Sequence, residues 1–114
     1  MSEEIIYINL EEGLNRVNKN AAFFNKLLGK FKNDTSINNI ETAFAEGDTE
    51  NAKNASHTLK GLAANLSLSE LYKQVLELET QVKNGSFNNE QMSLVRNTYD
   101  KTLLEIEKVI NAYG

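Results

Sequence analysis

The chain has 114 residues, a length that fits one domain. Hydrophobic residues make up 40% and charged residues 25%, close to globular averages, which excludes a disordered chain. The absence of Cys excludes a disulfide framework, a zinc–thiolate cluster and a thiol nucleophile. A net charge of −4 argues against general binding to nucleic-acid phosphates. We therefore expect a single domain over residues 1–114 that binds no nucleic acid.

The chain has no Pro and only six Gly, which favours long helices over many short strands. Its longest apolar runs are a handful of residues, far short of the ~20 that cross a bilayer. The start, Met1 to Glu4, is acidic and is not followed by an apolar stretch of signal-peptide length. These features predict a soluble, cytoplasmic helical domain without membrane insertion.

The first part of the chain predicts an arm and three helices. Residues 5–8 are the only strand-like stretch and are expected to form an arm or a lead-in to a short helix over residues 10–17. A second helix is predicted over residues 20–32 and a third over residues 36–46. Their inward-facing residues are predicted to be Phe24, Leu27, Leu28, Phe31, Ile37, Ile40 and Phe44.

Three longer helices are predicted to follow. Gly47 and Asp48 form a stop and a start before a helix over residues 48–66. Ser67 and Glu70 have the spacing of a capping box for the next helix, which Gly85 closes. Asn88, with Gln91 in the reciprocal position, is predicted to cap the last helix. The apolar stripes of these helices are Ala52, Ala55, Leu59, Leu62, Ala63 and Leu66; Leu68, Leu71, Val75, Leu78 and Val82; and Met92, Val95, Tyr99, Leu103, Ile106 and Ile110.

Short turns between these segments indicate that sequence neighbours pack antiparallel. The expected fold is all-α, an up-and-down four-helix bundle with one or two short additional N-terminal helices. No long apolar stripe is left over for a partner copy, so we expect a monomer.

His57 is the only histidine and therefore the only side chain expected to titrate near neutral pH. At about 100° per residue it points roughly 160° away from the inward-facing Leu59. The pattern thus predicts an imidazole in solvent, in the middle of a helix.

The helix periodicity also predicts the neighbours of His57, which are Lys53, Asn54, Lys60, Gly61 and, one turn further, Ala64. Lys60 brings an ammonium within one turn of the ring, where it can neutralise an anion. Gly61 costs about 1 kcal/mol relative to Ala inside a helix, and its bare backbone lets a macromolecule approach closely. Together these residues suit a group that is handed between proteins.

The segment over residues 54–66, NASHTLKGLAANL, resembles the H-x-L-K-G signature of histidine phosphotransfer (HPt) domains and the small-residue run after it. Residues 13–16 and 24–31 resemble the leading helices of that family, Gly47 and Asp48 the turn before its histidine helix, and residues 71–79 its next helix. The family commonly has Gly after the Asn-Leu pair, where this chain has Ser67, and the predicted capping box accounts for this difference.

The resemblance implies a multistep His–Asp phosphorelay. His57 would accept a phosphoryl group from a receiver-domain aspartyl phosphate and pass it to another receiver, and Lys60 would stabilise that group. Gly61, Lys53, Asn54 and Ala64 would belong to the docking surface. The implied partners are receiver domains of response regulators or hybrid sensor kinases. No cofactor is expected on this chain, and Mg²⁺ is expected in the receiver.

Other interpretations of the same residues remain. His57 could be an incidental surface histidine, and a metal site is disfavoured because no second His and no Cys exist to complete it. The chain has no nucleotide-binding loop and no kinase signature, so it would be a phosphoryl carrier (a histidine phosphotransferase) and not an autonomous kinase. The alternatives are a helical adaptor that carries no phosphate and the phosphoacceptor module of a chemotaxis-type kinase.

Overall fold

The computed structural model describes residues 5–113, and the acidic start, Met1 to Glu4, lies outside this range. Within the range every regular element is a helix, so the all-α prediction is confirmed. Residues 5–9 form a non-helical lead-in, as expected. The helices are α1 (Leu10–Arg16), α2 (Ala21–Phe31), α3 (Ser36–Glu46), α4 (Thr49–Asn65), α5 (Ser69–Lys83) and α6 (Asn89–Tyr113).

Polar side chains mark most helix starts, because the first backbone amides of a helix have no partner within it. Asp48 accepts a hydrogen bond from the backbone N–H of Asn51 at the start of α4, and Asn88 accepts one from Gln91 at the start of α6. Gly47 and Gly85 adopt positive φ angles of 65° and 83° just after α3 and α5. The predicted breaks at these glycines are confirmed.

The predicted capping box before α5 is wrong. Leu68 occupies the N-cap position and no side chain caps this helix. Ser67 lies in the left-handed region, with φ of 56°, and its hydroxyl donates to Glu12 at 2.8 Å. A left-handed backbone conformation favours glycine, because glycine has no Cβ atom to clash. This explains why Gly suits this position. The reciprocal bond predicted from Gln91 is also absent; its side-chain amide nitrogen donates to Gln74 of α5.

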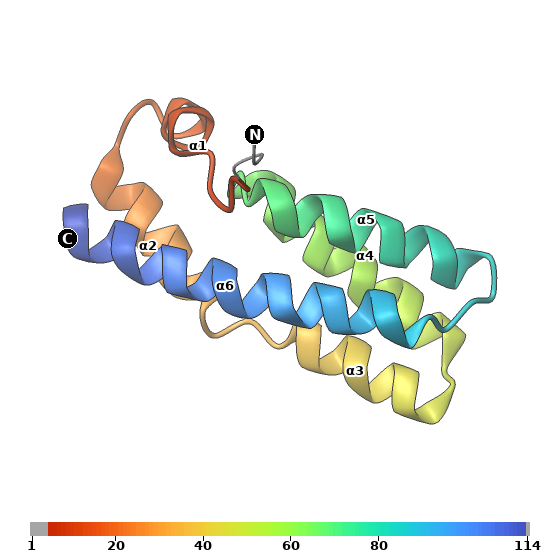
Figure 1. Ribbon diagram of the computed structural model, residues 1–114. Helices are drawn as coiled ribbons and strands as arrows, with labels where there is room; N and C mark the ends of the chain where they lie inside the picture. The colour runs from red at the N-terminus through yellow and green to blue at the C-terminus, as the bar shows by residue number, and fades with distance from the viewer. Residues whose placement is uncertain (1–4, 114) are drawn as a thin grey trace, which may run out of the picture.

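The long helices pack in chain order, α3 on α4, α4 on α5 and α5 on α6, and α3 also touches α6. Their colour gradients run in alternating directions in Figure 1. α2 packs against α6, and α1 contacts α2, where the ring of Phe24 lies so close to Gly13 that a Cβ atom there would clash. Most of the predicted inward residues are fully buried, and Leu27, Phe44, Ala55, Leu62, Leu103 and Ile110 are partly buried against the same cores.

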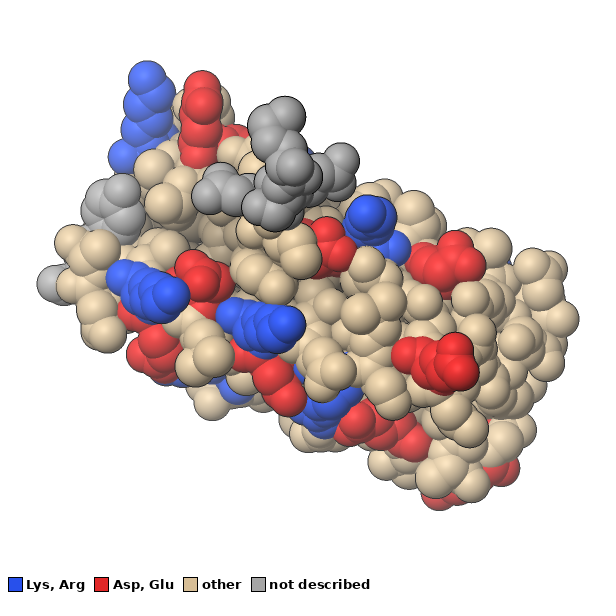
Figure 2. Space-filling model, viewed as in Figure 1, with Lys and Arg blue, Asp and Glu red and all other residues tan. Residues whose placement is uncertain are grey.

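Charged side chains of both signs alternate along α6 on the face shown in Figure 2. Two residues of α6 form ion pairs with other parts of the chain: Glu107 with Lys32, which follows α2, and Arg96 with Glu41 of α3. Among the helices of the described range, none combines the length and the apolar character that a membrane span requires. The fold displays mixed charge on this face and leaves one side of α4 exposed between α3 and α5.

Candidate functional site

His57 lies at the middle of α4 with 71% of its side chain exposed. The outward orientation of His57 is fixed by Ser56 and Leu59, because both of these neighbours on α4 are fully buried. The Ser56 hydroxyl donates to the backbone oxygen of Ala52 at 2.7 Å, which satisfies this polar group inside the core. The predicted exposure of the imidazole is confirmed.

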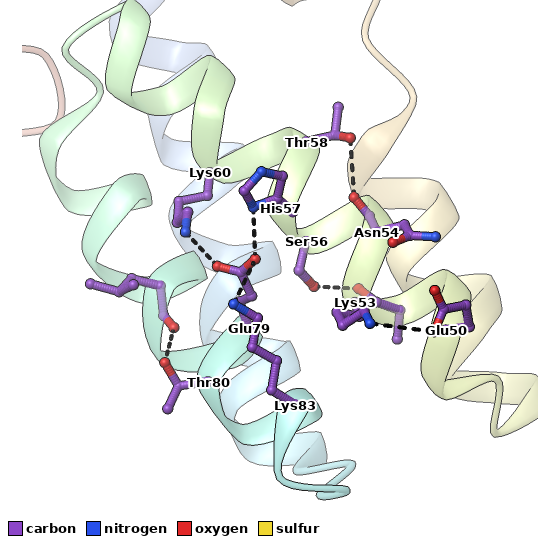
Figure 3. Close-up of polar contacts among 12 residues, drawn as sticks. Glu50, Lys53, Asn54, Ser56, His57, Thr58, Lys60, Glu79, Thr80 and Lys83 are labelled. Carbon is purple, nitrogen blue, oxygen red and sulfur yellow. Dashed lines mark hydrogen bonds and ion pairs between the residues drawn. The ribbon is translucent and has the colours of Figure 1, made fainter.

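The imidazole is held by one residue of the next helix, Glu79 of α5 (Figure 3). Nδ1 of His57 lies 2.9 Å from Oε2 of Glu79, whose side chain is only 2% exposed. Burial by itself would raise the pKa of Glu79, but hydrogen bonds from Lys60 and His57 and the charges of Lys60 and Lys83 outweigh it and leave this pKa below its ordinary value. Glu79 is thus ionised at neutral pH.

The ionised state of Glu79 fixes the tautomer of His57. A carboxylate can only accept hydrogen bonds, so Nδ1 must carry the hydrogen that it donates to Glu79. In the neutral ring Nε2 then keeps its lone pair, and Figure 3 shows this edge of the ring turned away from Glu79. The site therefore holds an oriented imidazole with its free nitrogen on the solvent side.

Lys60 stands beside His57, as the sequence predicts, but its ammonium is already paired. Nζ lies 2.6 Å from Oε1 of Glu79, and the side chain is 21% exposed. A second lysine, Lys83 of α5, approaches Oε2 of the same carboxylate at 3.7 Å and is 54% exposed. One buried carboxylate thus holds the imidazole and two ammonium groups at a single point (Figure 3).

Gly61 is exposed, and a Cβ atom built on it would meet nothing within 4 Å. Within residues 5–113, no packing contact therefore requires glycine at position 61. Ala64, one turn on, lines a shallow hollow of about 350 Å³ together with Tyr72. Tyr72 and Leu76 are exposed apolar side chains on the adjoining helix α5. Small residues on α4 thus lie beside an apolar strip on α5.

Lys53 and Asn54 lie on the N-terminal side of His57. Lys53 is partly exposed and its Nζ lies 3.4 Å from Glu50, one turn away, so it is not part of the cluster around Glu79. Asn54 is exposed and lines a polar groove of about 440 Å³ between α3 and α4, together with Asn39, Thr42 and Thr58. Asn54 therefore faces the α3 side of α4, whereas Lys60 faces the α5 side.

Sequence reasoning missed Glu79. It lies next to Leu78 and between Val75 and Val82, all buried, so it occupies an apolar stripe where a carboxylate is out of place. A buried acid needs a partner. An acidic residue in an otherwise apolar stripe was therefore the sequence signal that could have identified Glu79. Its two nearest partners, His57 and Lys60, come from α4, which the sequence alone could not pair with α5.

One comparison with known proteins finds a match: the model of the Hpt domain family matches residues 28–111. The matched range contains His57, Lys60, Gly61 and Glu79, and it leaves out α1 and the first part of α2, for which a resemblance was also predicted. No curated protein and no solved structure matches the chain at a significant level. Because the match covers most of the chain and includes the oriented histidine, the chain belongs to the Hpt domain family, whose function is histidine phosphotransfer in phosphorelay signalling.

Proposed function

We propose that this chain is the intermediate carrier of a multistep His–Asp phosphorelay. His57 takes a phosphoryl group from the aspartyl phosphate of one receiver domain and gives it to the aspartate of another. The whole chain acts as one domain, in which α3 to α6 serve as an up-and-down four-helix bundle and α1 and α2 as additional N-terminal helices. The observation that carries the proposal is an exposed imidazole whose Nδ1 is tied to a buried carboxylate.

The chemistry of acceptance follows from that hydrogen bond. The lone pair of Nε2 attacks the phosphorus of the acyl phosphate, the N–P bond forms, and the P–O bond to the aspartate breaks and leaves a carboxylate. The ring keeps the hydrogen on Nδ1 and becomes positively charged. Glu79, 2.9 Å from Nδ1, stabilises this charge, because it is buried, ionised and already aligned. Transfer to the next receiver reverses the same steps.

The receiver supplies what this chain lacks in the proposed mechanism. Mg²⁺ bound in the receiver would neutralise the oxygens of the transferred group, and Lys60 adds a charge from this side. The chain itself works as a carrier and not as a kinase, and its phosphoryl group arrives already activated on the partner.

The proposed docking surface is the outer side of α4 together with the apolar strip on α5. Gly61 and Ala64 allow the partner's backbone to come close to the imidazole. Tyr72 and Leu76 supply exposed apolar contact area beside them. Lys53 and Asn54 border the surface on the N-terminal side of His57. A small surface of this kind suits a transient signalling contact.

The test is transfer of label from a phosphorylated receiver. We expect wild-type protein to gain acid-labile, base-stable label, and His57→Gln to gain none while its helicity stays at the wild-type value. Lys60→Ala should slow transfer without abolishing it. Label retained by His57→Gln would overturn the assignment of His57.

The same experiment separates the rival functions. An adaptor would bind the receiver without gaining label. A kinase module would gain label from its own ATP-binding domain and little from receivers.

A further inference from the structure

We infer that Lys83 is a positioning residue that takes over the ion pair with Glu79 when Lys60 turns to a phosphoryl group on His57. The inference rests on the proposed function, since it concerns the phosphorylated state of the same site. Three groups compete for two carboxylate oxygens in the unphosphorylated protein. Nζ of Lys60 lies 2.6 Å from Oε1, and Nδ1 of His57 lies 2.9 Å from Oε2. Nζ of Lys83 lies 3.7 Å from Oε2.

The arrival of a phosphoryl group changes the balance at this point. The oxygens of the phosphoryl group on Nε2 carry about two negative charges, on the side of the ring away from Glu79, while the ring itself becomes positively charged. Lys60 is one turn from His57 on the same helix and is drawn to the larger charge. If nothing replaced Lys60, Oε1 of Glu79 would be buried without a hydrogen-bond donor, although the positively charged ring would still hold Oε2. A buried carboxylate oxygen without a donor is unfavourable.

Lys83 is placed to fill that vacancy. It lies four residues after Glu79 on α5, the orientation in which an acid and a lysine pair best along a helix. At 54% exposure its long side chain needs no cavity and no backbone movement to close the remaining gap. Figure 3 shows it reaching the carboxylate along α5, whereas Lys60 approaches from α4. The carboxylate would then remain neutralised in both states and keep its hold on Nδ1.

The alternative is that Lys83 is an ordinary surface lysine. Its effect on the protein would then be small and the same in both phosphorylation states, since exposed ion pairs contribute little. The two interpretations differ in one measurable way: the exchange requires Lys83 only after His57 is phosphorylated.

The experiment uses phosphoramidate as a small-molecule donor, so that no receiver contact is involved. Nε2 displaces ammonia from phosphorus, the P–N bond of the donor breaks, and phosphohistidine forms. After removal of the donor, ³¹P NMR follows the half-life of the phosphohistidine in wild type, Lys83→Gln, Lys83→Arg and Lys73→Gln. Lys73 is the matched control, because it is exposed on the same helix but six residues before Glu79 and on another face.

We expect Lys83→Gln to shorten the half-life about fivefold, the effect of an ion pair of about 1 kcal/mol. Lys83→Arg should restore the wild-type half-life and Lys73→Gln should not change it. The ¹³C signal of the Glu79 carboxyl supplies a second readout: its titration should move to higher pH on phosphorylation in Lys83→Gln and stay in place in wild type. In the unphosphorylated state, where Lys60 holds Glu79, Lys83→Gln should lower the unfolding midpoint only slightly, as expected for one exposed ion pair.

Two outcomes would overturn the exchange of lysines, and they can be told apart. If wild type is labelled on His57 but Lys83→Gln keeps both the half-life and the Glu79 titration of wild type, the exchange is overturned and the proposed function stands. If phosphoramidate does not label His57 in wild type, the proposed function fails and the exchange fails with it.

Discussion

At the residue scale the site depends on one buried acid. Glu79 accepts from Nδ1 of His57 at 2.9 Å and from Lys60 at 2.6 Å, with its side chain almost fully enclosed. It orients the ring, sets the tautomer and balances the charge that the ring gains when Nε2 is phosphorylated. Without it, His57 would be an imidazole rotating freely on a helix surface.

Glu79→Gln should slow phosphoryl acceptance by about 10- to 100-fold, the loss that follows when a charged hydrogen bond worth 1.5–3 kcal/mol is weakened. The substitution keeps the shape and an oxygen acceptor but removes the charge. Initial rates of label transfer from a phosphorylated receiver measure the effect. Glu77→Gln, an exposed acid on the same helix, is the control and should transfer at the wild-type rate. Equal rates for the two variants would remove Glu79 from the site.

The lowered pKa of Glu79 predicts how stability depends on pH. Burial acts against ionisation, but Lys60, His57 and Lys83 outweigh it, so the folded-state pKa lies below the unfolded-state value of 4.5. The carboxylate therefore contributes its full stabilisation above pH 4.5, and this is lost as the pH falls through the folded-state pKa. Urea unfolding of wild type and Glu79→Gln between pH 6 and pH 3 should show their free energies of unfolding converging in acid. A difference that stays constant would contradict the assignment.

Glu12 also has a lowered pKa, through hydrogen bonds from Ser67 and then Arg16. Its titration occurs in both proteins and cancels in that comparison. The matched variant therefore isolates the contribution of Glu79 from the general effect of acid on the fold.

At the scale of the element, α4 combines a core face with a cleared outer face. Leu59 and Ala63 are buried, while Gly61 stands exposed with nothing within 4 Å of its missing Cβ atom. Gly29 of α2 has the same open surroundings. Both glycines lie inside helices, but Gly29 is half-buried in the last turn of α2, whereas Gly61 is exposed on the same helix as His57.

Gly61→Gln and Gly29→Gln should each raise the free energy of unfolding by about 0.5 kcal/mol, because glutamine is the better helix former. Only Gly61→Gln should weaken receiver binding, by placing a side chain between the partner and the imidazole. Urea unfolding and titration with a fluorescent receiver measure the two effects. Undiminished binding by Gly61→Gln would remove steric access as the reason for this glycine.

At the scale of the whole molecule, the contact between α3 and α6 completes the bundle of the helices α3 to α6. The guanidinium of Arg96 holds both oxygens of Glu41, one of them from Nε at 2.9 Å, and donates to Asn38 at 3.0 Å. It also lies over the ring of Tyr99, 5.6 Å from its centre. None of these residues contacts the cluster around Glu79. The contacts that hold α3 against α6 are therefore separate from the site around His57.

Arg96→Lys should therefore lower the free energy of unfolding by about 1 kcal/mol, because lysine keeps the charge but cannot make the forked contact. Phosphoryl acceptance should stay at the wild-type rate. Arg16→Lys, in a more exposed pair with Glu12, is the control and should change stability by less than about 0.5 kcal/mol. Loss of acceptance in a folded Arg96→Lys protein would show that the site depends on this end of the bundle.

Local signals in the sequence were enough for the helices and for the position of His57. Helix periodicity and side chains such as Asp48 and Asn88 act within a few residues of one another, so they can be recognised along the chain. Ser67 shows where this reasoning fails. Its spacing to Glu70 fitted a capping box, but contact with Glu12, 55 residues away, and a left-handed backbone gave it another role.

The sequence by itself determined the helical class, the exposed imidazole and the cleared backbone at Gly61, because each depends on the turn of a single helix. Tertiary structure alone decided which nitrogen of His57 is free, what Lys60 pairs with, and that Lys83 belongs to the same cluster. Those three facts all depend on Glu79, which lies on α5, whereas His57 and Lys60 lie on α4. Only the packing of α5 on α4 buries that carboxylate beside the ring and turns an exposed histidine into an oriented one.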